Sequence, residues 1–176
     1  MPKRDLVKAK ALMKEAGVNG RFAVDFMAPK GPESQAVAEM IQAMAAEIGI
    51  DMKIRVTEFA TSLKQAEVGE YQAFFLDWSG RTDPDGNAYV FYICKGPQNN
   101  PAYCNPEVDR LLDESRTVSD FAGRKVAYQK LTRIILDDNP RLYLYHRRVL
   151  IAHTARLEGY KQMPDGLVRV VGLKLK

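Results

Sequence analysis

Residues 33–48 read ESQAVAEMIQAMAAEI, and in this stretch the apolar side chains recur three and four positions apart. That spacing places them on one face of an α-helix. The residues that keep the spacing are Val37, Met40, Ile41, Met44, Ala45 and Ile48. Gly49 follows at a position where many helices end. The stretch therefore predicts an amphipathic helix, and the other elements are placed on either side of it.

Alternating apolar residues on both sides of this helix predict β-strands. Before it, residues 21–27 alternate until Pro29 interrupts the pattern. After it, residues 52–56 alternate apolar with basic side chains, and a shorter helix follows over residues 59–66 before Gly69. The helix is thus predicted to connect two half-buried strands.

Residues 71–78 predict a third strand. Its centre, residues 73–76, is apolar on both faces, which is typical of an interior strand covered by helices on both sides. Strand, helix, strand, helix and strand in this order form two βαβ units, which close right-handed around a parallel sheet. A further helix is expected at residues 5–16. The first half of the chain is therefore predicted to be α/β.

The second half begins with residues 79–105, which show no periodicity and are predicted to form a long loop. Asn105 can then cap a helix that has Pro106 at its first position. Asp120 can cap a longer helix, which Pro140 ends. Two further strands are expected, at residues 142–145 and 149–152.

The composition is that of a folded globule, with 46% apolar and 27% charged residues among 176, a length that suits one ordinary domain. No run approaches the roughly 20 apolar residues of a membrane helix. The 26 basic and 22 acidic residues give a net charge of +4, spread along the chain. Nucleic-acid binding has weak support, since the basic and aromatic residues 143–148 are also typical of a strand that ends in solvated arginines.

Candidate catalytic groups are few. The only histidines, His146 and His153, stand in strand-like apolar surroundings, and no glycine-rich phosphate loop is present. Asp83 and Asp85 form a carboxylate pair within Asp-Pro-Asp-Gly, which is also a strong turn sequence in which Gly86 would adopt a positive φ. Their spacing does not match a calcium-binding loop. No metal site and no cofactor are predicted.

The two cysteines, Cys94 and Cys104, are too few for a zinc ribbon and too far apart for a CxxC redox motif. From the residues alone they are one disulfide or two separate thiols.

Several stretches occur together in an order that resembles a known family. They are KAKALMKEAG (8–17), EIGID (47–51), DWSGRTDPD (77–85), YCNPEVDRLL (103–112) and NPRLYL (139–144). From about Asp5 to about Gly159 the chain resembles the C-terminal lobe of family 5 extracellular solute-binding proteins. These are the dipeptide- and oligopeptide-binding components of ABC importers.

The resemblance implies a periplasmic-binding-protein-like lobe of type II. Such a lobe has βαβ units around a mostly parallel sheet, with a helical pair and further strands after a long loop. Residues 1–176 would be a single α/β lobe, a fragment of a two-lobe receptor about three times as long, lacking its signal peptide and first lobe. Residues 160–176 would form a tail that packs on the missing lobe.

The resemblance also implies a ligand-binding segment on the interlobe face. Its residues are Trp78, Ser79, Gly80, Arg81, Asp83 and Asp85. In the family's peptide binders the loop after the tryptophan supplies an aspartate for the ligand's amino group, whereas here the nearest position holds Arg81, and a register shift would give that role to Asp83. If Arg81 is the contact, its planar guanidinium favours a carboxylate or phosphate. Asp83 and Asp85 would then pair with Arg81 in the absence of ligand.

The extracytoplasmic location that the resemblance implies favours a disulfide between Cys94 and Cys104. The expected location is periplasmic or otherwise extracytoplasmic.

The function expected from these observations is a non-enzymatic lobe for peptide or oligopeptide uptake. A small-molecule or peptide ligand would be held in the interlobe cleft, and the partners would be the missing first lobe and an ABC permease in the membrane, with no nucleic acid. Two other readings stay open. One is a small hydrolase that uses Asp83 or Asp85 with His146, and the other is a basic nucleic-acid-binding module.

Overall fold

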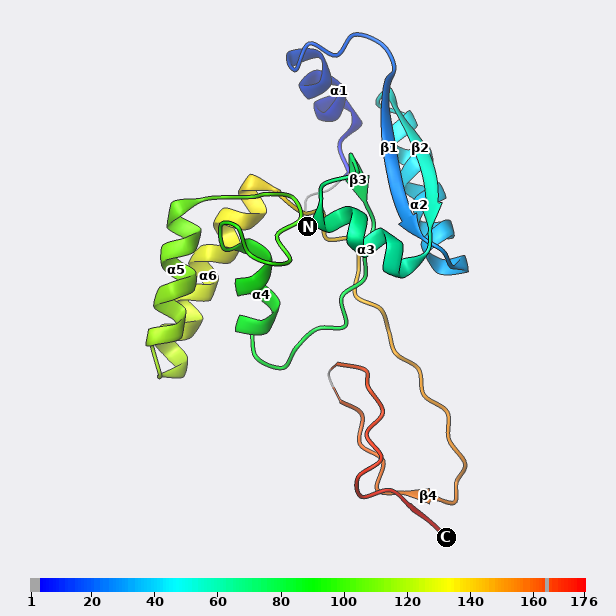
Figure 1. The fold of residues 1–176 in the computed structure, drawn as a ribbon, viewed down its shortest axis with the longest axis vertical. Coiled ribbons are helices and arrows are strands. Elements are labelled where there is room, and N and C mark those ends of the chain that lie inside the picture. The colour runs from blue at the N-terminus through cyan, green and yellow to red at the C-terminus, as the bar shows by residue number, and fades with distance from the viewer. Residues whose placement is uncertain (1–3, 164) are drawn as a thin grey trace. The chain divides into compact units, whose positions relative to one another are not determined.

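The computed structural model describes residues 4–163 and 165–176, which form two compact units (Figure 1). The first unit ends at Asp77, and the second runs from Trp78 to Lys176. The elements of the first are α1 (Leu6–Glu15), β1 (Phe22–Pro29), α2 (Pro32–Ala46), β2 (Ile50–Thr57), α3 (Phe59–Glu67) and β3 (Ala73–Phe74). Those of the second are α4 (Asp85–Tyr92), α5 (Pro106–Thr117), α6 (Phe121–Asp138), β4 (Leu157–Glu158) and β5 (Lys174–Leu175).

The first unit is built on a parallel sheet with the strand order β2-β1-β3. Phe26 and Ala28 of β1 are buried together with Ala38 of α2, and Figure 1 shows α2 lying along the β1–β2 pair. Met27 points to the opposite face of β1 and is fully buried. The predicted α/β fold with parallel βαβ units is therefore confirmed for this part of the chain.

The third strand lies within the predicted residues 71–78, but its length and its interior place in the sheet were predicted wrongly. Residues 71–78 were expected to form the interior strand, but β3 is only two residues long, and β1 is the strand with neighbours on both sides. The amide of Phe75 still donates to the carbonyl oxygen of Met27, at 3.0 Å. Asp77, Trp78 and Ser79 are exposed, so pairing with β1 ends where the buried apolar run ends.

The helices of the first unit lie where they were predicted. Asp5 caps α1 by accepting a hydrogen bond from the amide of Lys8 at 2.9 Å. None of the α1 residues is buried, however, and Leu12 is 53% exposed. The amphipathic spacing predicted this helix correctly but not its burial.

A helix, α4, lies inside the segment that was predicted to be a loop. The side chain of Asp83 accepts a hydrogen bond from the amide of Asp85 at 2.8 Å, so the Asp-Pro-Asp-Gly sequence starts a helix here. Gly86 is part of that helix and has no positive φ, contrary to the prediction. The helix forms because Phe91 and Tyr92 are buried against α5 and α6.

The predicted pair of helices is confirmed. The side chains of Asn105 and Asp120 cap α5 and α6 by accepting from the amides of Glu107 and Gly123, at 3.0 and 2.8 Å. Asn139 ends α6 in the left-handed conformation, with φ of 55°. The core of the second unit consists of Ala88, Phe91, Tyr92, Val108, Leu111, Leu112, Leu131 and Ile135.

The two further strands were predicted wrongly. Residues 142–145 and 149–152 have no regular secondary structure and are mostly exposed. The only strand pairing in the described part of this unit joins β4 to β5. Alternation identifies a segment that can form a strand, but a strand also needs a hydrogen-bonding partner.

Candidate functional site

The segment from Trp78 to Asp85 is fixed by one side chain of α4, that of Asn87. The Oδ1 atom of Asn87 accepts from Nε1 of Trp78 at 3.0 Å and from the amide of Arg81 at 2.7 Å. Its Nδ2 atom donates to the carbonyl oxygens of Arg81 and Asp83, at 2.7 and 3.2 Å. Gly80 permits the sharp bend between these contacts, with φ of 80°. Asn87 therefore determines the conformation of the whole segment.

Trp78 provides an aromatic surface in this segment. Its ring meets that of Phe91 edge to face, with the centroids 4.9 Å apart, and its side chain remains exposed. The guanidinium carbon of Arg81 lies 4.2 Å from the centre of the Trp78 ring, within cation–π distance. Arg81 also donates from Nη1 to the carbonyl oxygen of Gly80 at 2.7 Å and to Oγ of Ser79 at 3.3 Å. The structure thus brings four of the six predicted site residues together.

Asp83 and Asp85 are directed elsewhere. Asp83 is ion-paired with Arg124 of α6 at 2.9 Å, and the hydrogen bond from Arg124 lowers the pKa of Asp83. Asp85 accepts two hydrogen bonds from Arg116 of α5, at 2.8 and 2.9 Å. The expectation that these aspartates pair with Arg81 is wrong, because α5 and α6 present their own arginines to the start of α4.

Three features of the site were missed from the sequence. Asn87 lies in the stretch that was predicted to be a loop, and no role was predicted for Arg116 or Arg124. Gly86 was interpreted only as part of a turn. In the structure, a Cβ atom at this position would lie only 2.9 Å from Cγ of Arg81. Gly86 therefore leaves room for the aliphatic part of Arg81. A pattern could have located Asn87, because Ala88, Phe91 and Tyr92 have helical spacing.

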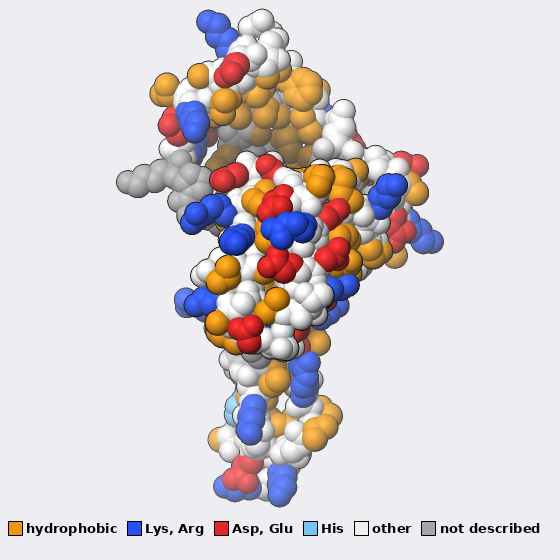
Figure 2. Space-filling view, turned by 90° about the vertical axis from the view of Figure 1, so that its left-hand side faces the viewer, with side chains coloured by type: hydrophobic (Ala, Val, Ile, Leu, Met, Phe, Trp, Pro, Cys, Tyr) orange, Lys and Arg blue, Asp and Glu red, His pale blue; other side chains and the backbone are white. Residues whose placement is uncertain are grey.

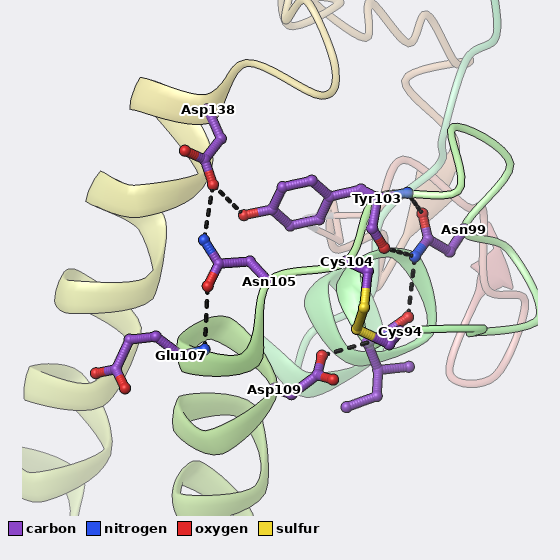
Figure 3. Close-up of a disulfide and its surroundings, with 9 residues drawn as sticks. Cys94, Asn99, Tyr103, Cys104, Asn105, Glu107, Asp109 and Asp138 are labelled. Atoms are coloured by element: carbon purple, nitrogen blue, oxygen red, sulfur yellow. Dashed lines mark hydrogen bonds between the residues drawn. A yellow bond between two sulfur atoms is a disulfide. The ribbon is translucent and has the colours of Figure 1, made fainter.

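The predicted disulfide between Cys94 and Cys104 is present (Figure 3). Asn99 closes the loop between them by donating to the carbonyl oxygens of Ile93 and Tyr103, at 2.9 and 2.6 Å. Asp109 of α5 accepts from the amide of Cys94 at 2.9 Å.

Cys94, Cys104 and Asp109 are the only group of potential metal ligands that lie close together among the described residues. The sulfur atoms are bonded to each other and offer no thiolate to a metal ion. The disulfide and the hydrogen bond from Cys94 to Asp109 attach the loop to α5.

The loop is also attached to the end of α6. Figure 3 shows Tyr103 and Asn105 pointing to the carboxylate of Asp138, to which they donate at 2.6 and 2.9 Å. Burial together with the hydrogen bond to Asp138 raises the pKa of Tyr103 to about 12. The two hydrogen bonds lower the pKa of Asp138. These contacts support the helical pair from which Arg116 and Arg124 project.

The histidines do not join the candidate site. His146 and His153 are both exposed, and the ring of His153 lies against that of Tyr160, at 5.5 Å. Asp83 and Asp85, the carboxylates with which His146 was to act, are held by arginines. The segment presents an exposed aromatic ring, an arginine stacked on that ring and two carboxylates that are each paired with another arginine.

A family model described as bacterial extracellular solute-binding proteins, family 5, middle region, matches residues 1–100. The chain belongs to this family. It is 32% identical over 171 residues to the dipeptide-binding protein of Escherichia coli, which covers 92% of this chain and 32% of that protein. The chain thus spans about a third of the length of the curated relatives that it matches.

Two solved structures of family 5 receptors resemble the chain. The dipeptide-binding protein of Pseudoalteromonas sp. SM9913, in complex with Met-Leu, matches all of the chain and 36% of its own length, with a TM-score of 0.81 and 26% identity. The ABC transporter-associated periplasmic binding protein of Helicobacter pylori, in complex with the peptide STSA, matches 77% of the chain and 28% of its own, with a TM-score of 0.70 and 35% identity. The type II periplasmic-binding-protein fold is therefore confirmed for this family 5 chain.

Proposed function

We propose that this chain is the ligand-binding lobe of the solute receptor of an ABC importer of the peptide or oligopeptide type. The observation that carries the proposal is the match of the whole chain, at a TM-score of 0.81, to a receptor solved with a dipeptide. The ligand is held in a cleft between this lobe and a second one. Closure of the two lobes excludes water and makes the receptor competent for its permease.

The domain organisation belongs to the same proposal. Residues 1–176 form one lobe of a longer two-lobe polypeptide, which agrees with a coverage of about a third of the relatives. Residues 160–176, of which 164 lies outside the described residues, pack on the other lobe. Leu142, Leu150 and Val171 are 76%, 85% and 93% exposed, and such apolar side chains need a covering surface.

The chain acts by binding and catalyses no reaction. The relatives are named as binding proteins. Asp83 and Asp85 are each ion-paired with an arginine of a neighbouring helix, so neither carboxylate is free to act with a histidine. The hydrolase alternative, which uses Asp83 or Asp85 with His146, therefore has less support.

A basic nucleic-acid-binding module is also less supported. Figure 2, which views the α5 side, shows basic and acidic side chains interspersed over that face without a continuous basic stripe. Arg110 of α5, for example, lies between Glu107 and Glu114 and pairs with both, at 2.7 Å. Affinity for phosphates requires an uncompensated positive surface.

The partners are a peptide or another small ligand, the other lobe and an ABC permease in the membrane, and the location is periplasmic or extracytoplasmic. The disulfide between Cys94 and Cys104 agrees with an oxidising compartment. No helix within the described residues has the length and hydropathy needed to cross a bilayer.

Ligand binding by the complete receptor tests the proposal. Thermal unfolding is followed with di- and oligopeptides, sugars and metal chelates, and a ligand at 100 times its Kd stabilises by about 2.7 kcal/mol. Stabilisation by peptides is expected. If no ligand stabilises the receptor, and if it hydrolyses esters or phosphates in a reaction that Asp83→Ala abolishes, the receptor function is wrong and the hydrolase function is supported.

A further inference from the structure

Arg81 has one side of its guanidinium group unused. Its Nη1 atom donates to Gly80 and Ser79, as described above. Within residues 4–163 and 165–176, its Nε and Nη2 atoms donate to no carboxylate and no carbonyl oxygen. The Nε–Nη2 side is therefore available to an acceptor from outside the described chain.

The same side of the guanidinium holds carboxylates elsewhere in this unit. Arg116 binds the two oxygens of Asp85 through Nε and Nη2, at 2.8 and 2.9 Å. Arg110 binds those of Glu107 through the same two atoms, at 2.9 and 2.7 Å. Two parallel charge-assisted hydrogen bonds are the strongest way in which arginine binds a carboxylate. Arg81 offers this arrangement without a partner.

The position of Arg81 is fixed before any ligand arrives. Its guanidinium lies over the ring of Trp78, and its aliphatic part passes Gly86 at a distance that excludes a Cβ atom. The side chain of Asn87 hydrogen-bonds to both the backbone amide and the carbonyl oxygen of Arg81. Little side-chain freedom is then lost when a ligand binds, which favours affinity.

The charges around Arg81 favour an anionic group. Asp83 and Asp85 are each neutralised by an arginine, so Arg81 supplies the one uncompensated charge among these five side chains. An ammonium group that approached either aspartate would share the carboxylate with Arg116 or Arg124. A carboxylate displaces nothing.

We propose that Arg81 determines the specificity of the receptor by binding a carboxylate of the ligand, and that Asp83 and Asp85 do not bind its amino group. This inference rests on the proposed receptor function. It differs from what the family resemblance implies, which is an aspartate for the ligand's amino group.

The test uses the complete receptor and a panel of dipeptides, each prepared as the free acid, the C-terminal amide and the N-acetylated acid. Calorimetry is expected to give a Kd for the acid that is about 10- to 100-fold lower than for the amide, the range for losing a hydrogen-bonded charge pair. N-acetylation is expected to change the Kd less than about threefold, because no aspartate of the segment binds the amine.

Three variants test whether Arg81 causes the preference for the acid over the amide. Arg81→Gln is expected to make acid and amide bind equally, and Arg81→Lys to restore only part of the preference, because lysine lacks the planar pair of donors. Gly86→Ala keeps every charge and favours the helix, but its Cβ moves Arg81, so affinity for the acid falls without a drop in Tm. Arg110→Gln, at an exposed paired arginine of α5, is the control and leaves the Kd unchanged.

The outcomes separate the two proposals. Equal binding of acid and amide, or an acid preference that survives Arg81→Gln, overturns the role of Arg81 and leaves the receptor function intact. Loss of binding on N-acetylation together with loss in Asp83→Asn overturns it as well. If no form of any peptide binds the unmodified receptor, the proposed function itself fails.

Discussion

The side-chain oxygen of Asn87 accepts hydrogen bonds from both the indole of Trp78 and the backbone amide of Arg81, at 3.0 and 2.7 Å. One residue of α4 thereby fixes an aromatic ring and the arginine stacked on it. Both the orientation of the ring and the course of the backbone depend on the same amide group. Removing that amide is expected to release the whole segment from Trp78 to Asp83.

Trp78 is the only tryptophan of the chain, so its fluorescence reports directly on this segment. In the 176-residue chain, Asn87→Ala is expected to shift the emission to longer wavelength and to increase quenching by acrylamide, because the indole loses its acceptor and gains solvent. Asn105→Ala is the matched control, since Asn105 hydrogen-bonds at the start of α5. An Asn87→Ala spectrum identical to that of the unmodified chain would show that Asn87 does not position Trp78.

The sequence predicted those elements whose signals are local. The side chains of Asn105 and Asp120 cap helices, and the helical period of residues 33–48 needs no information beyond its own spacing. By contrast, α4 was missed because the turn chemistry of Asp83 to Gly86 outweighed a short apolar pattern. The helix that forms instead, which begins after Asp83, depends on the burial of its apolar side chains against α5 and α6.

The contacts of the candidate site depend on tertiary packing, which the sequence alone did not reveal. The sequence of residues 78–85 singled out Arg81, Asp83 and Asp85 as candidate ligand contacts, a prediction that ligand binding has still to test. It suggested that they pair with one another, because they are neighbours in sequence. Arg116 and Arg124, which are 31 and 41 residues away, take the two carboxylates instead.

The pair of Asp85 and Arg116 is expected to stabilise the start of α4 only modestly. Its two hydrogen bonds are parallel, but the Arg116 side chain is 44% exposed, and exposed pairs contribute about 0.2–1 kcal/mol. A double-mutant cycle of Asp85→Asn and Arg116→Gln in urea measures this coupling. We expect a value in the upper half of that range that decreases in 1 M salt. A cycle on Arg110 and Glu114 provides a surface comparison, and a coupling of zero for Asp85 and Arg116 would contradict the assignment.

The disulfide is expected to stabilise the second unit by restricting its unfolded state. Closing a loop with a sequence separation of 10 contributes about 2–3 kcal/mol in the chain-entropy model. The double variant Cys94→Ser, Cys104→Ser should lose this amount in urea unfolding, and reduction of the unmodified protein should reproduce the loss. Since Asn99 and Asp109 still hold the folded loop, ligand binding should change little. An unchanged unfolding midpoint would indicate that the disulfide does not constrain the unfolded chain.

The hydrogen bond from Tyr103 to Asp138 is expected to make stability fall at both ends of the pH range. The pKa of Tyr103 is raised from 10 to about 12, so its contribution is complete below pH 10 and is lost as the pH rises toward 12. The pKa of Asp138 is lowered, so its contribution is present above its ordinary value of about 3.9 and is lost as the pH falls through the folded-state value.

Urea unfolding of the unmodified chain and of Tyr103→Phe, between pH 3 and 5 and between pH 9 and 11, measures both effects. The difference in stability between the two proteins should be largest near neutral pH and should shrink in both directions. Tyr160→Phe, at a tyrosine packed on His153, is the control. A constant difference across the whole range would mean that this hydrogen bond is not the source of the pH dependence.

The 176-residue chain by itself is expected to bind ligand much more weakly than the complete receptor. Arg81 and Trp78 are exposed, so a ligand resting on them keeps much of its surface in water, and most of the affinity of a small-molecule site comes from enclosure. Calorimetry with the same dipeptide on both proteins, after circular dichroism has established that the chain is folded, should give a Kd at least about 100-fold higher for the chain. Arg81→Gln should weaken binding to the receptor and have little measurable effect on the chain. Equal affinities for the two proteins would locate the whole binding site within these residues and remove the need for closure against a second lobe.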